Sequence, residues 1–458
     1  MYACIYGIIT AGDTALYTIT SYAVDLRHNK ELVHLYKQTL SIYRCAFSWC
    51  LAITEVYWDS IRNIPHINTQ MREIDKHIHA NKNHQDPEYD FDTAFPNMPV
   101  YFRRAVIVDA IGAYSSYLAN HANWENNGRK GREPQSGTVR NVYPTFYRGN
   151  MYDANDNEDA AKLKLFNGRT WDWYEVRLKH TDMQYLRNHW LAYGSLSAPT
   201  LEKHYGVYRL RFAVRKSSKL SDVPVKKQKI CAVDLGINTD ATCSVMTSDG
   251  TVLARKFINF ASDKAEVWHY LNKVKQFQHR HGSHDVGSLW RYVRNLNSQH
   301  AYKVANAIAD FAMISECDCI VFEHLNMSGR KIKGSKRQKL AMWKKNTVQI
   351  LCESIAHRHG IRISHICAWQ TSKLAYDGSG KTERSINGNY SICRFQNGRI
   401  YNCDLSASYN IGARYFIREI QKTMSESSWS RIKAEVPDAE KRTKCTLSTL
   451  WQLNAAVA

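Results

Sequence analysis

The strongest constraint on the fold is an alternation, beginning at Lys229, of short apolar runs and longer amphipathic stretches. Strands are predicted from Lys229 to Asp234, from Ala241 to Thr247, from Val252 to Phe257 and from Cys319 to Glu323. The stretches between and after them carry apolar residues at helical spacing. Three strands, a helical crossover, another strand and closing helices predict a mixed sheet covered by helices.

Carboxylates stand at three informative places in this half of the chain. Asp234 and Glu323 each end an apolar strand, and Asp404 opens a predicted helix from Ala407 to Ile420. A carboxylate that closes such a strand points out at the end of the strand, where α/β sheets place their sites. Asp404 is also a plausible helix N-cap. A single such residue is more often a turn or cap residue than a catalytic one.

Taken together, the three carboxylates predict a metal site. Three acidic groups gathered at one sheet would repel each other strongly unless cations neutralised them. Two hard cations about 4 Å apart can activate water and stabilise a leaving oxygen in phosphodiester hydrolysis. Ions of the Mg²⁺ type prefer oxygen ligands. Asp234, Glu323 and Asp404 would suit such cations if the fold brings the three side chains together.

The strings around these residues resemble the three split RuvC motifs of TnpB-type RNA-guided nucleases of insertion sequences and of compact type V CRISPR effectors. They are Val233-Asp234-Leu235-Gly236-Ile237-Asn238, Val321-Phe322-Glu323-His324-Leu325-Asn326 and Asp404-Leu405-Ser406-Ala407-Ser408-Tyr409-Asn410-Ile411. The resemblance covers the chain from about Lys229 to Ile420. It implies a RuvC-type, ribonuclease-H-like nuclease domain with two Mg²⁺ ions, which Mn²⁺ can replace, at Asp234, Glu323 and Asp404.

One departure from that family lies between the second and third motifs. The family usually carries a four-cysteine zinc module after a Thr-Ser pair, which is here Thr371-Ser372. No CxxC follows. A set made of His365, Cys367, Cys393 and Cys403 is conceivable but lacks the short ligand spacings of structural zinc sites. We expect zinc to be absent, with Tyr376, Tyr390 and Phe395 packing in its place.

The first half of the chain shows a different pattern of predicted helices and strands. Helices are predicted from Asn29 to Ile61 and from Val100 to about Trp124, and four β-type stretches follow from Tyr143 to Tyr152, Lys162 to Phe166, Tyr174 to Leu178 and Tyr208 to Val214. Together with an opening strand from Thr18 to Leu26 they predict a small β-barrel interrupted by helices. By resemblance, these parts correspond to wedge and recognition domains.

The resulting fold class is α+β and multidomain, with an N-terminal wedge-like β-barrel, an inserted helical recognition domain and a C-terminal RuvC-like α/β nuclease domain. The predicted divisions are residues 1–27 (first barrel strands), 28–126 (recognition), 127–224 (remainder of the barrel), 225–424 (nuclease, with 370–403 as a degenerate zinc-module insert) and 425–458 (C-terminal tail).

The charge balance points to a polyanionic partner. Lys and Arg number 62 against 42 Asp and Glu, for a formal net charge of +20, and the chain also holds 27 Tyr and 12 Trp. Cations hold phosphates, and aromatic faces stack on unpaired bases. A basic segment directly after Glu323 contains no acid, and we expect its cations to bind nucleic acid: Arg330, Lys331, Lys333, Lys336, Arg337, Lys339, Lys344 and Lys345. A solvated loop is the alternative there.

Weaker indications lie elsewhere. Tyr101, Arg103 and Arg104 open a helix, where contact with nucleic acid and an ordinary amphipathic helix start remain equally open. The 12 Cys include no CxxC, no run of about 18 apolar residues occurs, and from the residues at the start we expect no signal peptide. We therefore expect a cytoplasmic protein with free thiols and no membrane association.

The resemblance implies an RNA-guided DNA endonuclease. Its partners would be a guide RNA and double-stranded target DNA with a short flanking motif, because guide pairing reads the sequence while the protein reads shape and the flanking motif. Two alternatives stay open: a guide-carrying repressor that no longer cuts, and a non-guided RuvC-like nuclease or transposase. A transposon-derived guide and a CRISPR guide are both compatible with the sequence, and it leaves the oligomeric state open.

Overall fold

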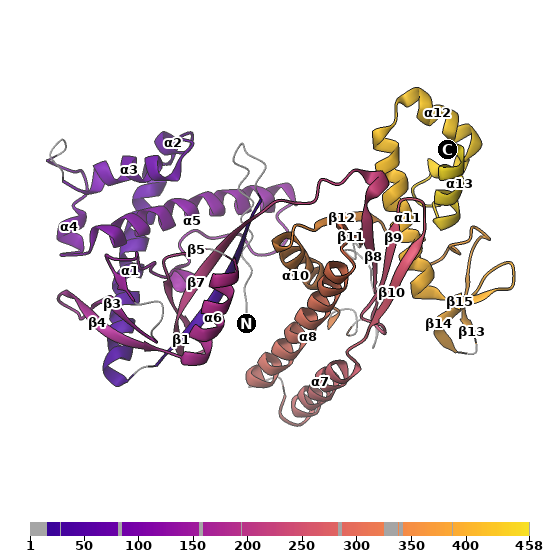
Figure 1. Ribbon diagram of the computed structural model, residues 1–458. Coiled ribbons are helices and arrows are strands. Elements are labelled where there is room, and N and C mark those ends of the chain that lie inside the picture. Colours follow the sequence, from indigo (N-terminus) through magenta and orange to yellow (C-terminus); the bar gives the residue numbers. More distant parts are fainter. Residues whose placement is uncertain are drawn as a thin grey trace. The chain divides into compact units, whose positions relative to one another are not determined.

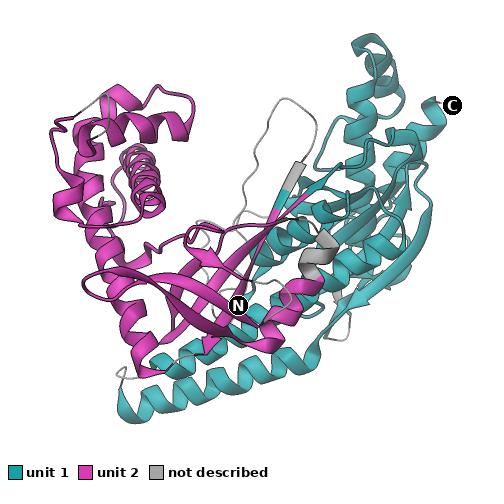
Figure 2. Ribbon diagram, turned by 60° about the vertical axis from the view of Figure 1, so that its left-hand side comes forward, with its two compact units in different colours: residues 1, 6–18, 217–458 teal, residues 2–5, 19–216 magenta. Residues whose placement is uncertain are grey.

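The chain folds as two compact units, whose main segments are Ile19–Lys216 and Ser217–Ala458 (Figure 2). The computed structural model describes residues 16–27, 29–80, 85–154, 159–193, 195–282, 286–324, 338, 342–386 and 388–457. The two units are described in turn, beginning with the one that carries the three carboxylates.

A five-stranded mixed sheet forms the centre of the Ser217–Ala458 unit (Figure 1). Its strand order is β10-β9-β8-β11-β12, and the strands span Val252–Ile258, Ala241–Thr247, Lys229–Leu235, Cys319–His324 and Arg362–Cys367. β8, β9 and β10 are antiparallel neighbours, whereas β11 runs parallel to both β8 and β12. The apolar runs of the sequence are the buried strands, so the predicted mixed sheet is confirmed.

The helices that pack around this sheet include four in the described part of the chain between β10 and the C-terminal tail. They are α7 (Ala261–His281), α8 (Gly287–Ile314), α10 (Lys345–Arg358) and α11 (Cys403–Thr423). α11 packs against β8 and β9 so closely that a Cβ atom on Gly412 would meet the Met246 sulfur at 2.4 Å and the Ala232 methyl at 3.3 Å. A side chain at position 412 would therefore have to displace the Met246 side chain. The close packing fixes the N-terminus of α11, and hence Asp404, against the sheet.

A small three-stranded sheet precedes α11. Its strands are β13 (Glu383–Ile386), β14 (Asn389–Arg394) and β15 (Ile400–Asn402). Tyr376 packs there against Phe395 and Tyr401, with ring centroids 5.7 and 5.0 Å away. Aromatic packing was expected in this insert, and Tyr376 and Phe395 are buried. Tyr390 is 69% exposed, so its predicted packing role is wrong.

The C-terminal tail belongs to the same unit. It forms α12 (Glu426–Glu435), η3 (Pro437–Ala439) and α13 (Leu447–Val457), of which α13 packs on α11. Arg414 of α11 is buried and donates to the Cys445 carbonyl at 3.1 Å, the Thr443 carbonyl at 2.9 Å and the Trp369 carbonyl at 2.8 Å. One guanidinium thus ties the tail to the loop after β12.

The Ile19–Lys216 unit is built on a seven-stranded sheet. The strand order is β2-β3-β4-β1-β7-β5 with β6 also pairing β7, and the strands span Tyr152–Asp153, Ala160–Phe166, Trp171–Leu178, Leu16–Arg27, Val207–Ser218, Ser195–Leu196 and Thr200–His204. The expected barrel is not found closed in the described part of the chain. The end strands β2 and β5 have two residues each, too few for a ladder that would join the two edges.

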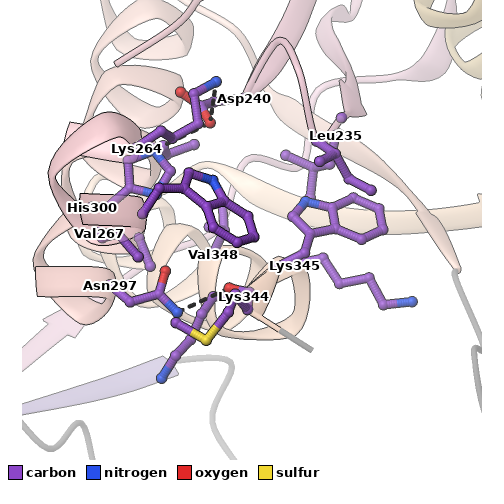
Figure 3. A pocket seen from close by; sticks show the side chains of 16 residues that line it. Leu235, Asp240, Lys264, Val267, Asn297, His300, Lys344, Lys345 and Val348 are labelled. Atoms are coloured by element: carbon purple, nitrogen blue, oxygen red, sulfur yellow. Dashed lines mark hydrogen bonds and ion pairs between the residues drawn. The ribbon is translucent and has the colours of Figure 1, made fainter. Parts of the chain in front are cut away.

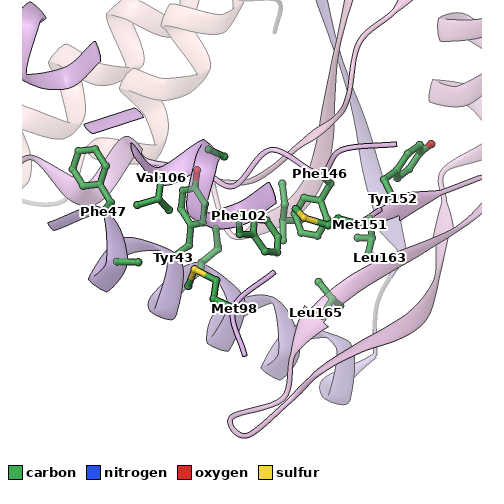
Figure 4. Packing of buried hydrophobic residues seen from close by; sticks show 14 of the residues in the cluster. Tyr43, Phe47, Met98, Phe102, Val106, Phe146, Met151, Tyr152, Leu163 and Leu165 are labelled. Atoms are coloured by element: carbon green, nitrogen blue, oxygen red, sulfur yellow. The ribbon is translucent and has the colours of Figure 1, made fainter. Parts of the chain in front are cut away.

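Among the described residues, five α-helices lie between β1 and β2 in the chain. They are α1 (Lys30–Val56), α2 (Trp58–Ile61), α3 (Ile67–Ile78), α4 (Phe91–Ala94) and α5 (Val100–Asn126). α1 and α5 pack together around aromatic side chains, as Figure 4 shows: Phe102 lies 5.7 Å from Tyr43 and 5.1 Å from Phe146 between ring centroids. The two long helices predicted from periodicity are confirmed.

Two features of this unit differ from the expectations. The stretch from Tyr143 to Tyr152 is not a strand, apart from β2 at its end, and a short helix η1 (Val139–Asn141) precedes it. Pro144 lacks an N–H for a ladder, and Gly149, at φ +73°, turns the backbone. α6 (His180–Tyr193) was not anticipated. A further short helix, η2 (Val225–Lys227), leads into β8 in the other unit.

Arg103, one of the residues considered for nucleic-acid contact, is 4% exposed and pairs with Asp75 at 2.9 Å. Its guanidinium joins α5 to α3, so it supports the fold and does not face solvent. Within the described residues, no helix combines the length and the apolar character needed to cross a bilayer.

Candidate functional site

Asp234 and Glu323 are the last residues but one of two neighbouring parallel strands, β8 and β11. Val233 of β8 is the register partner of Phe322 of β11, and each carboxylate residue follows immediately. Side chains at the same end of adjacent parallel strands meet at one edge of the sheet, which is where α/β sheets place their sites. The apolar residues before Asp234 are buried, whereas Asp234 itself is half-buried. The sheet therefore presents two acidic groups at one edge.

The Glu323 carboxylate is 7% exposed and accepts a hydrogen bond from the Thr371 hydroxyl. Thr371 lies in the loop after β12 and is itself buried. Burial raises the pKa of Glu323, while the Thr371 hydrogen bond and the positive charges of Arg414 and Lys345 partly oppose that rise. The sequence did not reveal this role for Thr371.

Asp404 is the second residue of α11. The N-cap of α11 is Asn402, whose side-chain oxygen accepts from the Asp404 N–H at 3.0 Å and from the Leu405 N–H at 2.9 Å. The alternative that Asp404 is the N-cap is therefore excluded, and its carboxylate is not needed to cap the helix. Burial raises the pKa of Asp404, against the lowering effects of Arg384 and of a hydrogen bond with the Thr239 side chain.

The three carboxylates interact electrostatically. The pKa of Asp234 lies well above its ordinary value, first because the group is desolvated and then because Glu323 and Asp404 add negative charge. Among the described residues, no three His, Cys, Asp or Glu side chains lie close enough to ligate one metal ion. The structure thus brings the three predicted residues into one electrostatic cluster without assembling a closed ligand set.

Arg384, on β13, was missed by the sequence reasoning. Its positive charge lowers the pKa of both Asp234 and Asp404. Its guanidinium donates to the Ser372 carbonyl from Nε at 3.2 Å and from Nη2 at 2.9 Å, and the residue remains exposed. An exposed cation fixed beside acidic groups can contact an anion bound at them. No local sequence motif identifies Arg384, because the residue comes close to Asp234 and Asp404 only through the tertiary fold.

Most of the predicted basic nucleic-acid-binding segment lies outside the described residues: Arg330, Lys331, Lys333, Lys336, Arg337 and Lys339. Lys344 and Lys345 are described. Lys345 is 8% exposed, its Nζ lies 5.6 Å from the centroid of the Trp343 ring, and its charge acts on Glu323. Lys345 therefore lies buried toward the carboxylates instead of on an exposed loop. Lys344 Nζ is 3.5 Å from the Ser298 hydroxyl.

A small cavity of about 70 Å³ adjoins the end of β8 (Figure 3). Leu235 and Asp240 line it together with Lys264 and His300 from the two long helices. The Asp240 carboxylate is buried, and burial opposes its ionisation. Hydrogen bonds with His300 and the Phe260 N–H nevertheless leave its pKa below the ordinary value. Lys264 Nζ lies 3.2 Å from Asp240, so this acid is fully engaged in the fold.

Comparisons with known proteins bear on this site and fold. Residues 20–167 match the model of the Aq_aa04 family. The chain is 26% identical over 240 residues to the TnpB-like protein aq_aa05 of Aquifex aeolicus (strain VF5), a match that covers 48% of this chain and 78% of that protein. The predicted resemblance to TnpB-type proteins is confirmed.

Among solved structures, the chain is similar to a protein in the cryo-EM structure of the Cas12f1–sgRNA–target DNA complex. The TM-score is 0.50 at 14% sequence identity, and the match covers 83% of this chain and 81% of that one. At this identity the likeness concerns the fold. The chain thus has a mixed α+β, multidomain fold that resembles the fold of the Cas12f1 protein.

Proposed function

We propose that this protein is an RNA-guided DNA endonuclease that hydrolyses phosphodiester bonds at Asp234, Glu323 and Asp404. The observation that carries the proposal is the electrostatic cluster: Glu323 at the end of a neighbouring strand and Asp404 at the start of a helix, both far from Asp234 in the sequence, add negative charge beside it. Clustered carboxylates with strongly raised pKa values are costly for a fold and are concentrated at functional sites. The likeness to a TnpB-like protein supports the guided mode of action.

The residues present fit hard divalent cations in their chemistry. All three side chains offer carboxylate oxygens, and their mutual repulsion is what positive ions would relieve. Asp234, Glu323 and Asp404 would hold the ions. Two Mg²⁺ ions, or Mn²⁺ in their place, would supply an activated water and charge neutralisation at the scissile phosphate. Because no closed ligand set is present among the described residues, the proposal requires the three carboxylates to approach one another on binding.

The other residues of the chain have defined tasks at this site. Thr371 orients the Glu323 carboxylate through its hydroxyl, and Asn402 caps α11 so that the Asp404 side chain remains available. Arg384 offers an exposed guanidinium beside the carboxylates, where it can contact a phosphate oxygen of the substrate. These groups position the substrate and the ligands; none of them needs to transfer a proton.

The alternatives make different demands on the same residues. A guide-carrying repressor has no need of three clustered acids, which would only destabilise it, so the intact cluster favours cleavage. A non-guided nuclease or transposase has no need of a guide-binding N-terminal unit. The similarity to the Cas12f1 complex covers 83% of this chain and therefore extends beyond the carboxylate-bearing unit. The partners that we propose are a guide RNA and double-stranded DNA with a short flanking motif, in the cytoplasm.

Sequencing of the RNA that co-purifies with the protein tests the guided function. The protein would be expressed together with its native flanking DNA, washed at moderate salt, and its bound RNA sequenced. A discrete RNA species is expected, and its redesign should redirect cleavage to a matching DNA. Random cellular fragments, with cleavage indifferent to the RNA supplied, would instead favour the non-guided nuclease.

A further inference from the structure

The Ile19–Lys216 unit contains an open groove of about 860 Å³ that the proposed active site does not explain. Its walls come from α1, from the segment around η1, and from the hairpin between β6 and β7. The volume lies within the range of roughly 300–1,000 Å³ that is usual for ligand sites. Four of the lining residues are cations and none is an acid: Lys37, Arg44, Arg140 and Lys203.

One face of α1 supplies a polar wall. Lys37, Ser41, Arg44 and Ser48 follow one another at intervals of three or four residues, which places them on one stripe of the helix. The opposite stripe of α1, which includes Tyr43 and Phe47, is buried in the core. The helix thus turns a polar face that includes two cations, Lys37 and Arg44, toward the groove.

The guanidinium of Arg44 is held in place within the groove. Its Nε donates to the Val142 carbonyl at 3.2 Å, its Nη2 donates to the Arg140 carbonyl at 2.9 Å, and its charge lies 5.4 Å from the centroid of the Tyr143 ring. On the facing wall, the Tyr143 hydroxyl donates to the Lys203 carbonyl at 3.3 Å. A positive charge fixed in this way loses little freedom when it binds a phosphate.

The tip of the β6–β7 hairpin carries an unusual residue. His204 pairs with Val207, so the loop consists of Tyr205 and Gly206, with φ values of +48° and +90°. Two-residue turns of this kind favour Asn, Asp or Gly at both positions, and a tyrosine there is strained. Its side chain is nevertheless 59% exposed, with its ring centroid 4.2 Å from that of His204. Strain of this sort concentrates at functional positions.

We propose that this groove binds unpaired nucleotides of a nucleic-acid strand, with Tyr205 stacking on a base and the four cations holding phosphates. Cations that follow the backbone and an exposed aromatic ring that accepts a base are the two elements of single-strand binding. RNA and DNA share this chemistry, and the test distinguishes them. The proposal rests on the nucleic-acid binding that the proposed function requires, but not on cleavage.

The test uses the full-length protein in EDTA, stripped of co-purified nucleic acid by a high-salt wash. Fluorescence anisotropy would measure Kd for labelled single-stranded RNA and DNA on the order of ten nucleotides long across a salt series. Tyr205→Asn removes the ring but suits the turn better than tyrosine, so the variant should fold at least as well as the wild type. Lys162→Ala, at an exposed position of β3 outside the groove, is the matched charge control.

Tyr205→Asn should weaken binding by about fivefold or more, as expected when one base no longer stacks. A Lys37→Ala, Lys203→Ala double variant should bind more weakly and reduce the slope of log Kd against log salt by about one for each phosphate that is no longer held. Lys162→Ala lies outside the groove, so it should not change the contribution that Tyr205 makes to Kd. Weaker binding of RNA alone, of DNA alone or of both supports the groove and identifies the strand that it holds.

Cross-linking locates the strand independently. Oligonucleotides with a thio-substituted pyrimidine should cross-link to peptides that contain Tyr205 or Tyr143, and Tyr205→Asn should remove the first of these adducts. The proposal is overturned if both groove variants bind RNA and DNA as Lys162→Ala does and all cross-links fall on other peptides. Absence of cleavage after Mg²⁺ addition would count against the proposed nuclease without affecting this result.

Discussion

The Thr371 hydroxyl donates a hydrogen bond to the Glu323 carboxylate, joining the loop after β12 to the end of β11. That loop is itself anchored, because the Asn410 side-chain amide donates to the Thr371 carbonyl at 3.0 Å and to the Leu374 carbonyl at 2.9 Å. Asn410 belongs to α11, the helix that carries Asp404. One chain of contacts therefore links the surroundings of two of the three carboxylates.

Thr371→Val should slow cleavage while leaving the fold intact, because valine keeps the volume and lacks the hydroxyl. The hydrogen bond favours the ionised carboxylate, so its removal should raise the pKa of Glu323 further. We expect a rate about tenfold lower, typical of groups that orient metal ligands, and an acid limb shifted to higher pH. Single-turnover cleavage across pH measures both, and Thr371→Ser should retain the wild-type profile. Identical profiles for valine and serine would remove Thr371 from the site.

Arg384→Gln should have two effects of opposite sign. Removal of a positive charge beside Asp234 and Asp404 should lower the Mg²⁺ concentration needed for half-maximal cleavage. The maximal rate should fall by about tenfold or more, because the phosphate then lacks a cationic partner. A Mg²⁺ titration separates these effects. Arg394→Gln, an exposed arginine on the adjacent strand β14, is the control and should change neither quantity. A faster reaction at every Mg²⁺ concentration would contradict the proposed role of Arg384 at the phosphate.

The Ile19–Lys216 unit should show a pH-dependent stability that depends on Asp109. Burial raises the pKa of Asp109 from 3.8 to about 6, although the Tyr43 hydroxyl donates to it at 2.7 Å. Between these values the folded state holds more protons than the unfolded state, so the free energy of unfolding falls as pH rises from about 4 to about 6. Above about pH 6, the loss in the free energy of unfolding caused by the ionised Asp109 carboxylate is constant, at most about 3 kcal/mol.

Asp109→Asn removes this penalty and can still accept the Tyr43 hydrogen bond. The variant should therefore melt at a higher temperature than the wild type at pH 7.5 and at nearly the same temperature at pH 4. Thermal unfolding at the two pH values measures the difference. An equal shift at both pH values would mean that the effect does not come from ionisation of Asp109.

The zinc content of the protein remains a prediction. The Cys393 thiol donates to the Tyr401 carbonyl at 3.5 Å, and its interaction with the Cys403 thiol raises the pKa of Cys393 and lowers that of Cys403, whereas Cys367 is exposed. Aromatic rings around Tyr376 fill this part of the insert. We expect far less than one equivalent of zinc by elemental analysis, and near-normal cleavage by Cys393→Ser. Stoichiometric zinc that disappears together with activity in this variant would show a divergent zinc module.

The sheet around the site could be predicted because its strands are encoded locally. The run before Asp234 and the run before Glu323 are continuous apolar segments, as strands buried on both faces require. The polar residue that closes each run marks the edge of the sheet. The sequence therefore predicted where Asp234 and Glu323 lie on the sheet, whereas their catalytic role stays a prediction.

The partners of these carboxylates could not be predicted in the same way. Thr371 acts 48 residues after Glu323, and Arg384 gains its role only because β13 lies beside the carboxylates. Contacts of this kind depend on tertiary packing, which local periodicity does not encode. The buried ion pair of Arg103 with Asp75 was missed for the same reason.

Two other differences between the predicted and the observed elements could have been foreseen from local features of the sequence. Met183 and Leu186 of α6 are buried and lie three residues apart, as one face of a helix requires. Pro144 and Gly149 interrupt the stretch that resembled a strand. The open sheet, in contrast, follows from the brevity of β2 and β5, which composition does not reveal.

Cleavage of guide-matched DNA by single-carboxylate variants tests the proposed nuclease site most directly. Guide-loaded wild type, Asp234→Ala, Glu323→Ala and Asp404→Ala would be compared with Mg²⁺ for cleavage and without it for binding. Asp222→Ala, which removes an exposed carboxylate away from the cluster, is the control. We predict that none of the three variants cleaves, that their DNA binding is nearly unchanged and that the control is active. A variant at any of the three positions that cuts at the wild-type rate would contradict the proposed site.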